Sequence, residues 1–400
     1  MRILHTSDLH IGKNLNDFSL LEDQAYILDQ ICDIALQEKA DCVVIAGDLY
    51  DRSIPPSEAV VLLDDFLSKL TMQLHLPVIA ISGNHDGGKR LAFASRLYEA
   101  QGLYMESIFS PKLRQVTLSD AYGEIHFWLV PYVDLPTIRS ELSAFPQLET
   151  PETLSSGYAQ LMRLNVDRID ASQRNILVGH SFFGKFSSEG QSEPDKLIFS
   201  ESEVSVGGTD IVDASVFDCF DYVALGHLHA PQKVGTEWMQ YSGSPLKYSI
   251  SEAEHSKSVT MVEMGPKGQV DFKKIPLTPL RDLRVLTGYL SELTDRTMLS
   301  EQNLEDYVFV NLLDDGFVLD AMSKLRVIYP NVLGIRMVKQ DEEILLHPAS
   351  SSHIAKKGME DLFAEFYKAV KGETLNEEQF QIMNDVFEQV RRNEEGGDEQ

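Results

Sequence analysis

The sequence predicts an α/β protein in which two packed β-sheets are flanked by helices, followed by a small α+β module. Short apolar runs alternate with segments of helical periodicity in the first hundred residues, a pattern typical of α/β domains with a largely parallel central region. Further apolar runs then follow too densely for one doubly wound sheet. Near residue 281 the pattern changes to a smaller unit of strands and one helix.

The composition is that of a large globular protein. Hydrophobic residues make up 43% of the 400 residues and charged residues 24%, which excludes global disorder. No apolar run approaches the roughly 20 residues needed to span a bilayer, so we expect neither a membrane protein nor an exported one. The formal net charge of -27 argues against a chain that coats DNA by general electrostatics. Cys32, Cys42 and Cys219 form no CxxC pair and lie in apolar stretches, so we expect core thiols in the cytoplasm.

The elements of the first part follow in order from these patterns. Apolar runs predict strands at 3–7, 42–46 and 78–82, and helical periodicity predicts helices at 20–39, 57–70 and 89–100. Later strands are expected at 116–118, 125–130, 175–178, 222–225, 239–241 and 258–263. Two sheets with helices outside them accommodate this number of strands.

The rest of the chain divides into shorter parts. Residues 1–278 form the first predicted domain, and residues 281–347 form a compact α+β domain with strands at 284–286, 307–312 and 332–338 and a helix at 318–329. A serine-rich linker covers 348–358, two amphipathic helices cover 359–392, and an acidic tail covers 393–400. Asn376 is the expected N-cap of the second helix. These helices either pack on the body of the protein or clasp an external helix or coiled coil.

Five short segments concentrate metal-binding side chains, and each directly follows a predicted strand. They are Asp8-Leu-His10, Gly47-Asp48-Leu-Tyr-Asp51, Gly83-Asn84-His85-Asp86, Gly179-His180 and Gly226-His227-Leu-His229. In an α/β fold the carboxyl ends of neighbouring strands meet at one rim, so we expect these side chains to converge. One such segment occurs easily by chance, whereas five in order do not.

The number and type of these ligands predict two metal ions. The oxygen and nitrogen donors of these segments exceed the needs of one ion, while two ions bridged by a shared carboxylate use them well. Histidine with carboxylate favours Mn²⁺, Fe²⁺ or Zn²⁺ over Ca²⁺ and Mg²⁺. Such a pair suits hydrolysis of phosphate esters.

The order DxH, GDxxD, GNHD, GH and GHxH resembles the calcineurin-like metallophosphoesterase superfamily from residue 1 to about residue 277. Within that superfamily the segments MRILHTSDLHIGK, AGDLYD, SGNHD, DYVALGHLH and YSGSP resemble the bacterial SbcD family. The resemblance implies that Asp8, His10 and His229 bind one ion, that Asn84, His180 and His227 bind the other, and that Asp48 bridges them. Mn²⁺ is the ion that we expect.

The resemblance also implies roles beyond the ligands. His85 matches a histidine that faces the scissile phosphate without binding metal. Asp51 is expected to orient His85 through a hydrogen bond, with a helix-start or turn aspartate as the alternative. Lys89 and Arg90 are candidates for DNA contact, with ordinary exposed basic residues as the alternative. The loop 181–194 either steers an unpaired strand or is simply packed.

A nuclease subunit that hydrolyses DNA phosphodiester bonds is therefore the expected function. The resemblance implies a partner ATPase of the SbcC type, gripped at its coiled coil by the carboxyl-terminal helices, and a homodimer within a heterotetramer. One alternative is a small-molecule phosphodiesterase of the same superfamily, and another is a tether with a structural metal site. Protein phosphatases are disfavoured because the chain has Asp51-Arg52-Ser53 and GNHD where they typically have GDxxDRG and GNHE.

Overall fold

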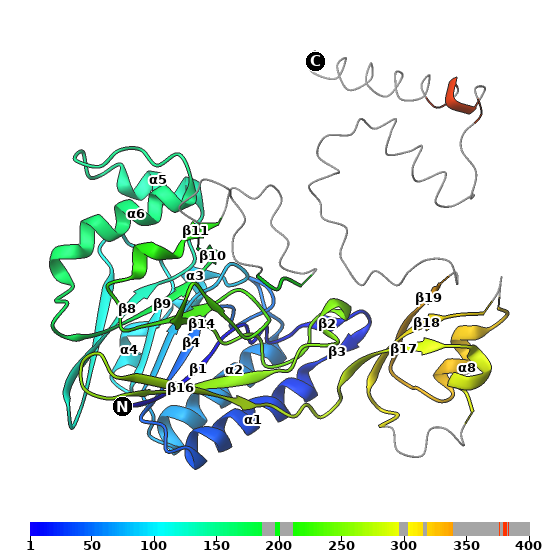
Figure 1. Cartoon of the computed structure of the whole chain (residues 1–400). Helices are drawn as coiled ribbons and strands as arrows, with labels where there is room; N and C mark the ends of the chain where they lie inside the picture. Colours follow the sequence, from blue (N-terminus) through cyan, green and yellow to red (C-terminus); the bar gives the residue numbers. More distant parts are fainter. Residues whose placement is uncertain are drawn as a thin grey trace. The chain divides into compact units, whose positions relative to one another are not determined.

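The computed structural model describes residues 1–185, 197–200, 211–295, 303–314, 318–338, 376, 379–381 and 383. The chain forms two compact units, Met1–Glu343 and Ile344–Gln400. The first unit contains two six-stranded sheets and a separate three-stranded sheet (Figure 1). The predicted linker 348–358, the tail 393–400 and most of the helical segment 359–392 lie outside the described residues.

The first six-stranded sheet carries a parallel centre and an antiparallel edge. Its order is β16 (Val270–Pro276), β15 (Ser258–Met264), β1 (Arg2–Thr6), β4 (Cys42–Ala46), β5 (Val78–Ile81) and β6 (Leu103–Glu106). Strands β1, β4, β5 and β6 run parallel, and β15 pairs antiparallel with β1.

The second six-stranded sheet has the same kind of parallel centre. Its order is β13 (Gln232–Val234), β14 (Thr236–Tyr241), β12 (Tyr222–Gly226), β9 (Arg174–His180), β8 (Gly123–Val130) and β7 (Arg114–Asp120). Strands β8, β9, β12 and β14 run parallel. The predicted pair of sheets is confirmed.

The two sheets pack face to face, and helices cover their outer faces. Alternate residues of β4 divide between two clusters, because Cys42, Val44 and Ala46 face the second sheet while Val43 and Ile45 face the helices. Burial on both faces explains why this strand is apolar throughout. Helices α1 (Leu21–Gln37) and α2 (Ser57–Ser68) cover the first sheet, and α5 (Leu135–Leu142) and α6 (Leu154–Asn165) cover the second.

Short elements complete the body of the first unit. A π-helical turn continues α2 over Lys69–Gln73. Two-stranded pairs join β2 (Asn14–Leu15) to β3 (Phe18–Ser19) and β10 (Phe183–Gly184) to β11 (Val212–Asp213). Single 3₁₀ turns lie at Val166–Arg168, Ala214–Phe217 and Ile250–Glu252.

Two expectations for this part of the chain are wrong. The helix expected at 89–100 is broken into α3 (Gly88–Leu91) and α4 (Ser95–Glu99), because Ala94 adopts a left-handed φ of 59°. Cys219 is exposed, whereas Cys32 and Cys42 are buried. Its apolar neighbours Phe217 and Phe220 fill the core in its place.

The three-stranded sheet confirms the small α+β module. Strands β17 (Leu283–Gly288), β18 (Tyr307–Leu312) and β19 (Val332–Met337) are parallel, with α7 (Leu290–Leu293) and α8 (Ala321–Arg326) beside them. Their apolar side chains form a separate cluster. Tyr307 of β18 donates a hydrogen bond to Asp23 of α1 at 2.9 Å, which joins this sheet to the body.

The second unit offers one test of the sequence analysis. The Asn376 side chain accepts a hydrogen bond from the backbone N–H of Gln379 at 2.9 Å, and the Gln379 side chain accepts one from the backbone N–H of Asn376. Asn376 therefore caps a helix, as expected. Among the described residues of the whole chain, no helix has the length and apolar character needed to cross a membrane.

Candidate metal centre

The five predicted segments converge at the carboxyl ends of strands from both sheets. The loops after β1, β4 and β5 come from the first sheet, and β9 and β12 supply the others. Four of the predicted ligands leave their strands with a positive φ, namely Asp8 (54°), His10 (43°), Asp48 (49°) and His227 (110°). Such backbone strain persists where the surrounding structure holds a functional geometry.

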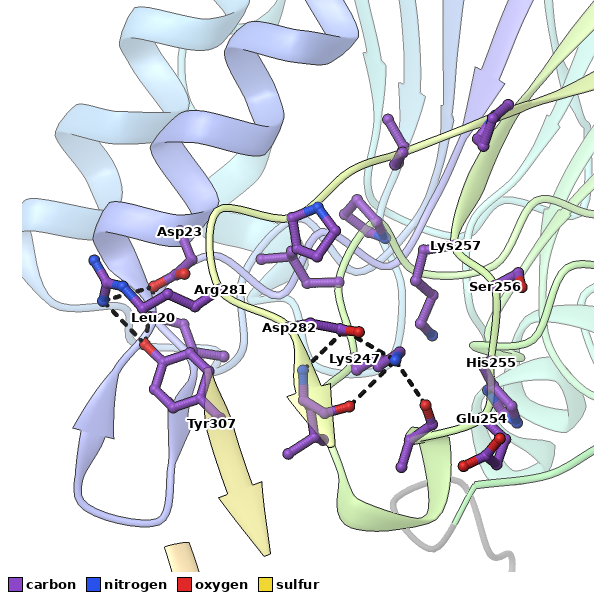
Figure 2. A pocket seen from close by; sticks show the side chains of 17 residues that line it. Leu20, Asp23, Lys247, Glu254, His255, Ser256, Lys257, Arg281, Asp282 and Tyr307 are labelled. Atoms are coloured by element: carbon purple, nitrogen blue, oxygen red, sulfur yellow. Dashed lines mark hydrogen bonds and ion pairs between the residues drawn. The ribbon is translucent and has the colours of Figure 1, made fainter. Parts of the chain in front are cut away.

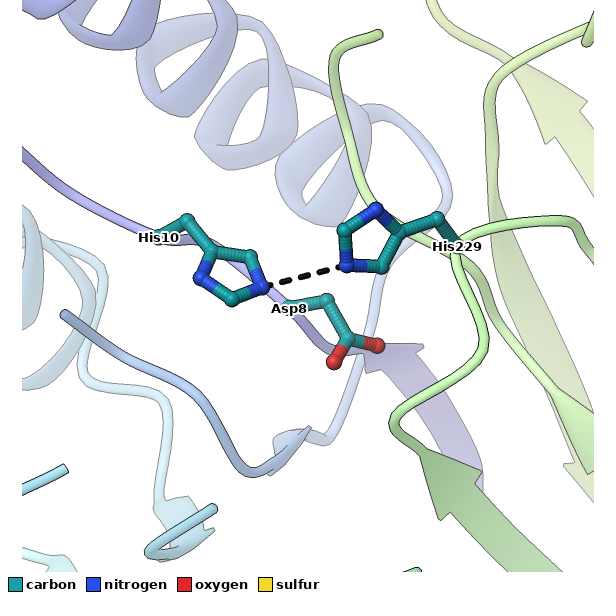
Figure 3. A group of neighbouring side chains, drawn as sticks. All are labelled: Asp8, His10 and His229. Carbon is teal, nitrogen blue, oxygen red and sulfur yellow. Dashed lines mark hydrogen bonds between the residues drawn. The ribbon is translucent and has the colours of Figure 1, made fainter. Parts of the chain in front are cut away.

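Asp8, His10 and His229 form one group of potential ligands (Figure 3). The Nε2 atoms of His10 and His229 lie 3.2 Å apart, and all three side chains are buried. Both carboxylate oxygens of Asp8 accept from the backbone N–H of His227, at 3.0 and 3.1 Å. Burial raises the pKa of Asp8 above its ordinary value and lowers that of His10 well below it.

Asn84, His180 and His227 surround a second point. The Oδ1 atom of Asn84 lies 3.1 Å from Nε2 of His180 and 3.0 Å from Nδ1 of His227. Asn84 is exposed while His180 is buried, so this side of the centre is open to solvent. Burial lowers the pKa of His227 well below its usual value.

Asp48 lies between the two groups. Its Oδ2 atom is 3.3 Å from Nε2 of His180 and 3.6 Å from Nε2 of His10, while its Oδ1 atom accepts from the backbone N–H of His85 at 2.8 Å. Burial alone raises the pKa of Asp48, but the charge and hydrogen bond of His180 bring it below the ordinary range. A buried, ionised carboxylate therefore contacts a member of each group.

This donor set fits a pair of divalent ions. Nδ1 of His180 donates to the backbone carbonyl of Ala46 at 2.8 Å, so the neutral ring has only a lone pair to present to Asn84 and Asp48. Acceptors that face one another need a cation between them. Spacings near 3 Å are those of neighbouring ligands that each lie about 2.0–2.2 Å from one ion. Burial lowers the pKa of His180, but the charge and hydrogen bond of Asp48 raise it to about 9, so the cation between Nε2 and Asp48 is a proton on the ring unless a metal ion takes its place.

His85 lies beside both groups without joining either histidine set. Its ring packs edge-on against His10 with a centroid separation of 4.7 Å. Nδ1 of His85 donates to the backbone carbonyl of Asp51 at 2.9 Å, which fixes the ring and leaves Nε2 for another partner. The sequence analysis expected a hydrogen bond between these residues, but the partner of His85 is the backbone of Asp51.

The carboxylate of Asp51 has a different set of contacts. Lys13 donates to its Oδ1 atom at 2.8 Å, and Arg52 lies 3.5 Å from its Oδ2 atom. His10 lies 3.9 Å away, so Asp51, His10 and His85 also form a cluster. The two cations make this cluster less suited to a metal ion than the groups around Asp48.

Close approach between the loops explains two of the motif glycines. A Cβ atom on Gly83 would lie 2.2 Å from Oδ1 of Asp48, and one on Gly47 would lie 2.2 Å from Nδ1 of His180. Asp86 ties the same loops together by accepting from the backbone N–H groups of Leu49 and Gly83. Burial and the charge of Asp48 raise the pKa of Asp86 to about 7.

Lys89 and Arg90 lie at the end of the same loop and are exposed. They line a surface hollow with Ile54 and Phe93.

In the loop expected at 181–194 only residues 181–185 are described. Phe182 and Phe183 there are buried, with the Phe182 ring 4.0 Å from the ring of His227. The packed alternative therefore holds for these two aromatic residues.

Two charged residues near His229 have no role predicted from the sequence. Glu252 and Lys257 are buried, and Oε1 of Glu252 lies 2.9 Å from Nδ1 of His229. Burial raises the pKa of Glu252, but the charges of Lys257 and His229 bring it below the usual range. A glutamate and a lysine five residues apart carry no local signal of such a role, because the contact depends on how β15 and the loop after β12 pack.

The segment 241–245, for which the sequence predicts no role, lies under the site. The hydroxyl of Tyr241 donates to the backbone carbonyl of Ser181 at 2.7 Å, and Ser242 lies 2.8 Å from Ser7. Ser244 accepts from Lys257 at 2.8 Å. These contacts support the loops that carry His180, Asp8 and His229.

Two known protein families match parts of this chain. Residues 1–231 match the family described as calcineurin-like phosphoesterase, and residues 279–371 match the type 5 capsule protein repressor C-terminal domain. The chain is 34% identical over 381 residues to the SbcD subunit of the SbcCD nuclease of Staphylococcus epidermidis, and the match covers 95% of this chain and 96% of that protein.

Two solved structures show weaker similarity. A protein of Thermus thermophilus matches 68% of this chain and 98% of its own length, with 12% identity and a TM-score of 0.37. A dimetal phosphatase from Danio rerio matches 70% of this chain and 99% of its own length, with 14% identity and a TM-score of 0.37.

The phosphoesterase match covers more than half of the chain, and the match to the Staphylococcus epidermidis protein covers nearly all of both proteins. The side chains at the rim are of the kinds that bind divalent metal ions. The chain belongs to the calcineurin-like phosphoesterase family and, within it, to the family of SbcD nuclease subunits.

Proposed function

We propose that this chain is a DNA nuclease subunit that hydrolyses phosphodiester bonds with two divalent ions, Mn²⁺ being the expected metal. The observation that carries the proposal is the position of Asp48, whose Oδ2 atom lies 3.3 Å from His180 and 3.6 Å from His10. Asp8, His10 and His229 would hold one ion, and Asn84, His180 and His227 would hold the other, with Asp48 shared. Nitrogen and oxygen ligands together favour Mn²⁺ over Mg²⁺.

The ions and the residues around them have different roles in hydrolysis. When bound, a pair of divalent ions supplies a nucleophilic water at neutral pH and stabilises charge on the phosphate oxygens. His85, fixed through its Nδ1 by the backbone of Asp51, presents Nε2 to the phosphate or the departing oxygen. Lys89 and Arg90 are exposed at the end of the same loop, where they contact the DNA backbone.

The name of a relative supports the proposed protein partner of this chain. The Staphylococcus epidermidis protein is named as the SbcD subunit of an SbcCD nuclease, and we place this chain in an equivalent complex with an SbcC-like ATPase. Residues 1–278 form the nuclease domain and 281–347 the capping domain, while 359–392 grip the coiled coil of the ATPase through their amphipathic faces. The three free cysteines fit a cytoplasmic location.

A second copy of the chain is the partner proposed for an exposed apolar surface. Ile54 and Phe93 are 72% and 78% exposed, and they line one hollow. Large apolar side chains gathered in this way are typical of interaction surfaces. The homodimer places two such nuclease chains in a heterotetramer.

Digestion of a linear DNA duplex and a DNA hairpin by the purified chain in Mn²⁺ tests the proposal. We expect cleavage of DNA that changes when the ATPase and ATP are added. If both DNAs stay intact in all conditions while a small chromogenic phosphodiester is hydrolysed, the chain is instead a small-molecule phosphodiesterase.

A further inference from the structure

A buried ion pair lies directly behind the metal centre. Glu252 is the last residue of the 3₁₀ turn Ile250–Glu252, and Lys257 precedes β15. Glu252 is 0% exposed and Lys257 is 6% exposed. Charges of this kind are costly to bury, so each needs well-placed partners.

The hydrogen bonds of Lys257 hold Glu252 in place. Nζ of Lys257 donates to Oε2 of Glu252 at 2.5 Å, to the hydroxyl of Ser244 at 2.8 Å and to the backbone carbonyl of His229 at 2.9 Å. All three protons of the ammonium group are therefore used. The side chain of Lys257 also lines a cavity of about 350 Å³ at the start of β17, together with His255 and Glu254 (Figure 2).

The other oxygen of Glu252 contacts a member of the metal centre. Its Oε1 atom lies 2.9 Å from Nδ1 of His229 and accepts from the hydroxyl of Ser249 at 3.2 Å. The ionised carboxylate can only accept a hydrogen bond at this contact, so Nδ1 is the donor and the hydrogen of a neutral His229 ring resides on Nδ1. The lone pair of His229 is then on Nε2, the atom that lies 3.2 Å from Nε2 of His10.

We propose that Glu252 is a positioning residue for His229: it fixes the ring orientation and the Nδ1–H tautomer, and Lys257 holds Glu252 in that position. This inference rests on the proposed metal centre. It adds a carboxylate–histidine contact behind the group of Asp8, His10 and His229, whereas in the other group Nδ1 of His180 donates to a backbone carbonyl.

Two double variants test whether Glu252 positions His229 or is only one half of a buried ion pair with Lys257. Glu252→Gln/Lys257→Met and Glu252→Met/Lys257→Met both remove the ion pair and replace it with side chains of similar length. Only the first retains an acceptor for the Nδ1 hydrogen of His229. Glu254→Gln is the matched control, because Glu254 lines the same cavity but is exposed.

The readout is Mn²⁺ binding to the full chain, measured by titration and by electron paramagnetic resonance of the coupled pair. We expect the wild type and the control to bind two ions, and the Glu252→Gln/Lys257→Met variant to bind the ion on the His229 side more tightly than the Glu252→Met/Lys257→Met variant does. In the Met/Met variant the ion on the His229 side should bind about 10–100-fold more weakly, while the other ion is retained. Equal affinities in both double variants, whether both high or both low, would overturn the role of the Glu252 acceptor.

A second measurement needs no bound metal. Long-range ¹H–¹⁵N spectra of the metal-free wild type, with the His229 signals assigned by His229→Asn, report the tautomer directly. The Nδ1–H form supports the proposal, and the Nε2–H form contradicts it. If the wild type fails to bind two ions, the proposed function is wrong, whereas the tautomer still decides the role of Glu252.

Discussion

His5 shows how a single buried side chain links stability to pH. Its Nδ1 lies 3.0 Å from the hydroxyl of Tyr222, and burial lowers the pKa of His5 from 6.5 to about 3. As the pH falls below 6.5, the unfolded chain takes up a proton that the folded chain does not. The free energy of unfolding therefore falls with pH in this window, by up to about 1.4 kcal/mol per pH unit from this one group.

The prediction is that His5→Gln makes the free energy of unfolding less steeply dependent on pH between about pH 6.5 and pH 4. Urea unfolding of the metal-free chain at several pH values measures the slope. His75→Gln is the control, since His75 is exposed. Identical slopes in the wild type and His5→Gln would show that His5 does not titrate in this way.

Gly83 carries a prediction at the scale of the loops between strands. The loop after β5 approaches the loop after β4 so closely that a Cβ on Gly83 would lie 2.2 Å from Oδ1 of Asp48 and 2.5 Å from its backbone nitrogen. Gly83→Ala must displace Asp48, and we expect metal affinity to fall by at least about tenfold. Metal titration of the purified variant measures this loss.

Gly179→Ala is the matched control for this substitution. Gly179 also precedes a predicted ligand, but a Cβ there would meet its nearest neighbour at 3.6 Å, an ordinary contact. Metal affinity close to that of the wild type is therefore expected for Gly179→Ala. If both variants lose metal equally, the close approach of the two loops is not the cause.

Local patterns predict the elements that are buried on both faces. Strand β4 is apolar throughout because its two faces pack against the second sheet and the helices, and the motif residues follow such strands. Strand β16 escaped prediction because it is an edge strand in which charged residues such as Lys273 and Lys274 interrupt the apolar run. The break at Ala94 depends on a single left-handed residue, which helical periodicity does not reveal.

The same distinction applies to the candidate site. Ligand positions are predictable because each lies at a strand end that the sheet topology must bring to one rim. The role of Glu252 could not be predicted from the sequence, because its contact with His229 joins residues on different segments of the chain. The contact between His85 and Asp51 was predicted as a pair, but a residue type says nothing about which atom of Asp51 accepts.

At the scale of the whole molecule, the proposed dimer predicts a change in mass. Phe93→Glu places a charge in the exposed apolar surface of Ile54 and Phe93 and should convert a dimer to a monomer without loss of metal. Light scattering coupled to gel filtration measures the mass. Val327→Glu is the control, because Val327 is 70% exposed on a different part of the chain. A wild type that is monomeric at micromolar concentration would contradict the proposal.

The proposed ATPase contact predicts the effect of a truncation. Removal of residues 355–400 should abolish copurification with an SbcC-like ATPase, because the amphipathic helices proposed to grip its coiled coil are lost. Hydrolysis of a small chromogenic phosphodiester should persist, since every predicted ligand precedes this region. A truncated chain that still binds the ATPase would show that the helices have another role.

In the proposed site, seven side chains hold two ions while His85 acts on the phosphate. The most direct test measures Mn²⁺ content and phosphodiester hydrolysis together in the wild type, Asp48→Ala and His85→Gln. We predict that Asp48→Ala loses both ions, whereas His85→Gln keeps both and loses at least about 10²-fold in hydrolysis. Loss of metal from His85→Gln equal to that from Asp48→Ala, or wild-type hydrolysis by His85→Gln, would contradict the account.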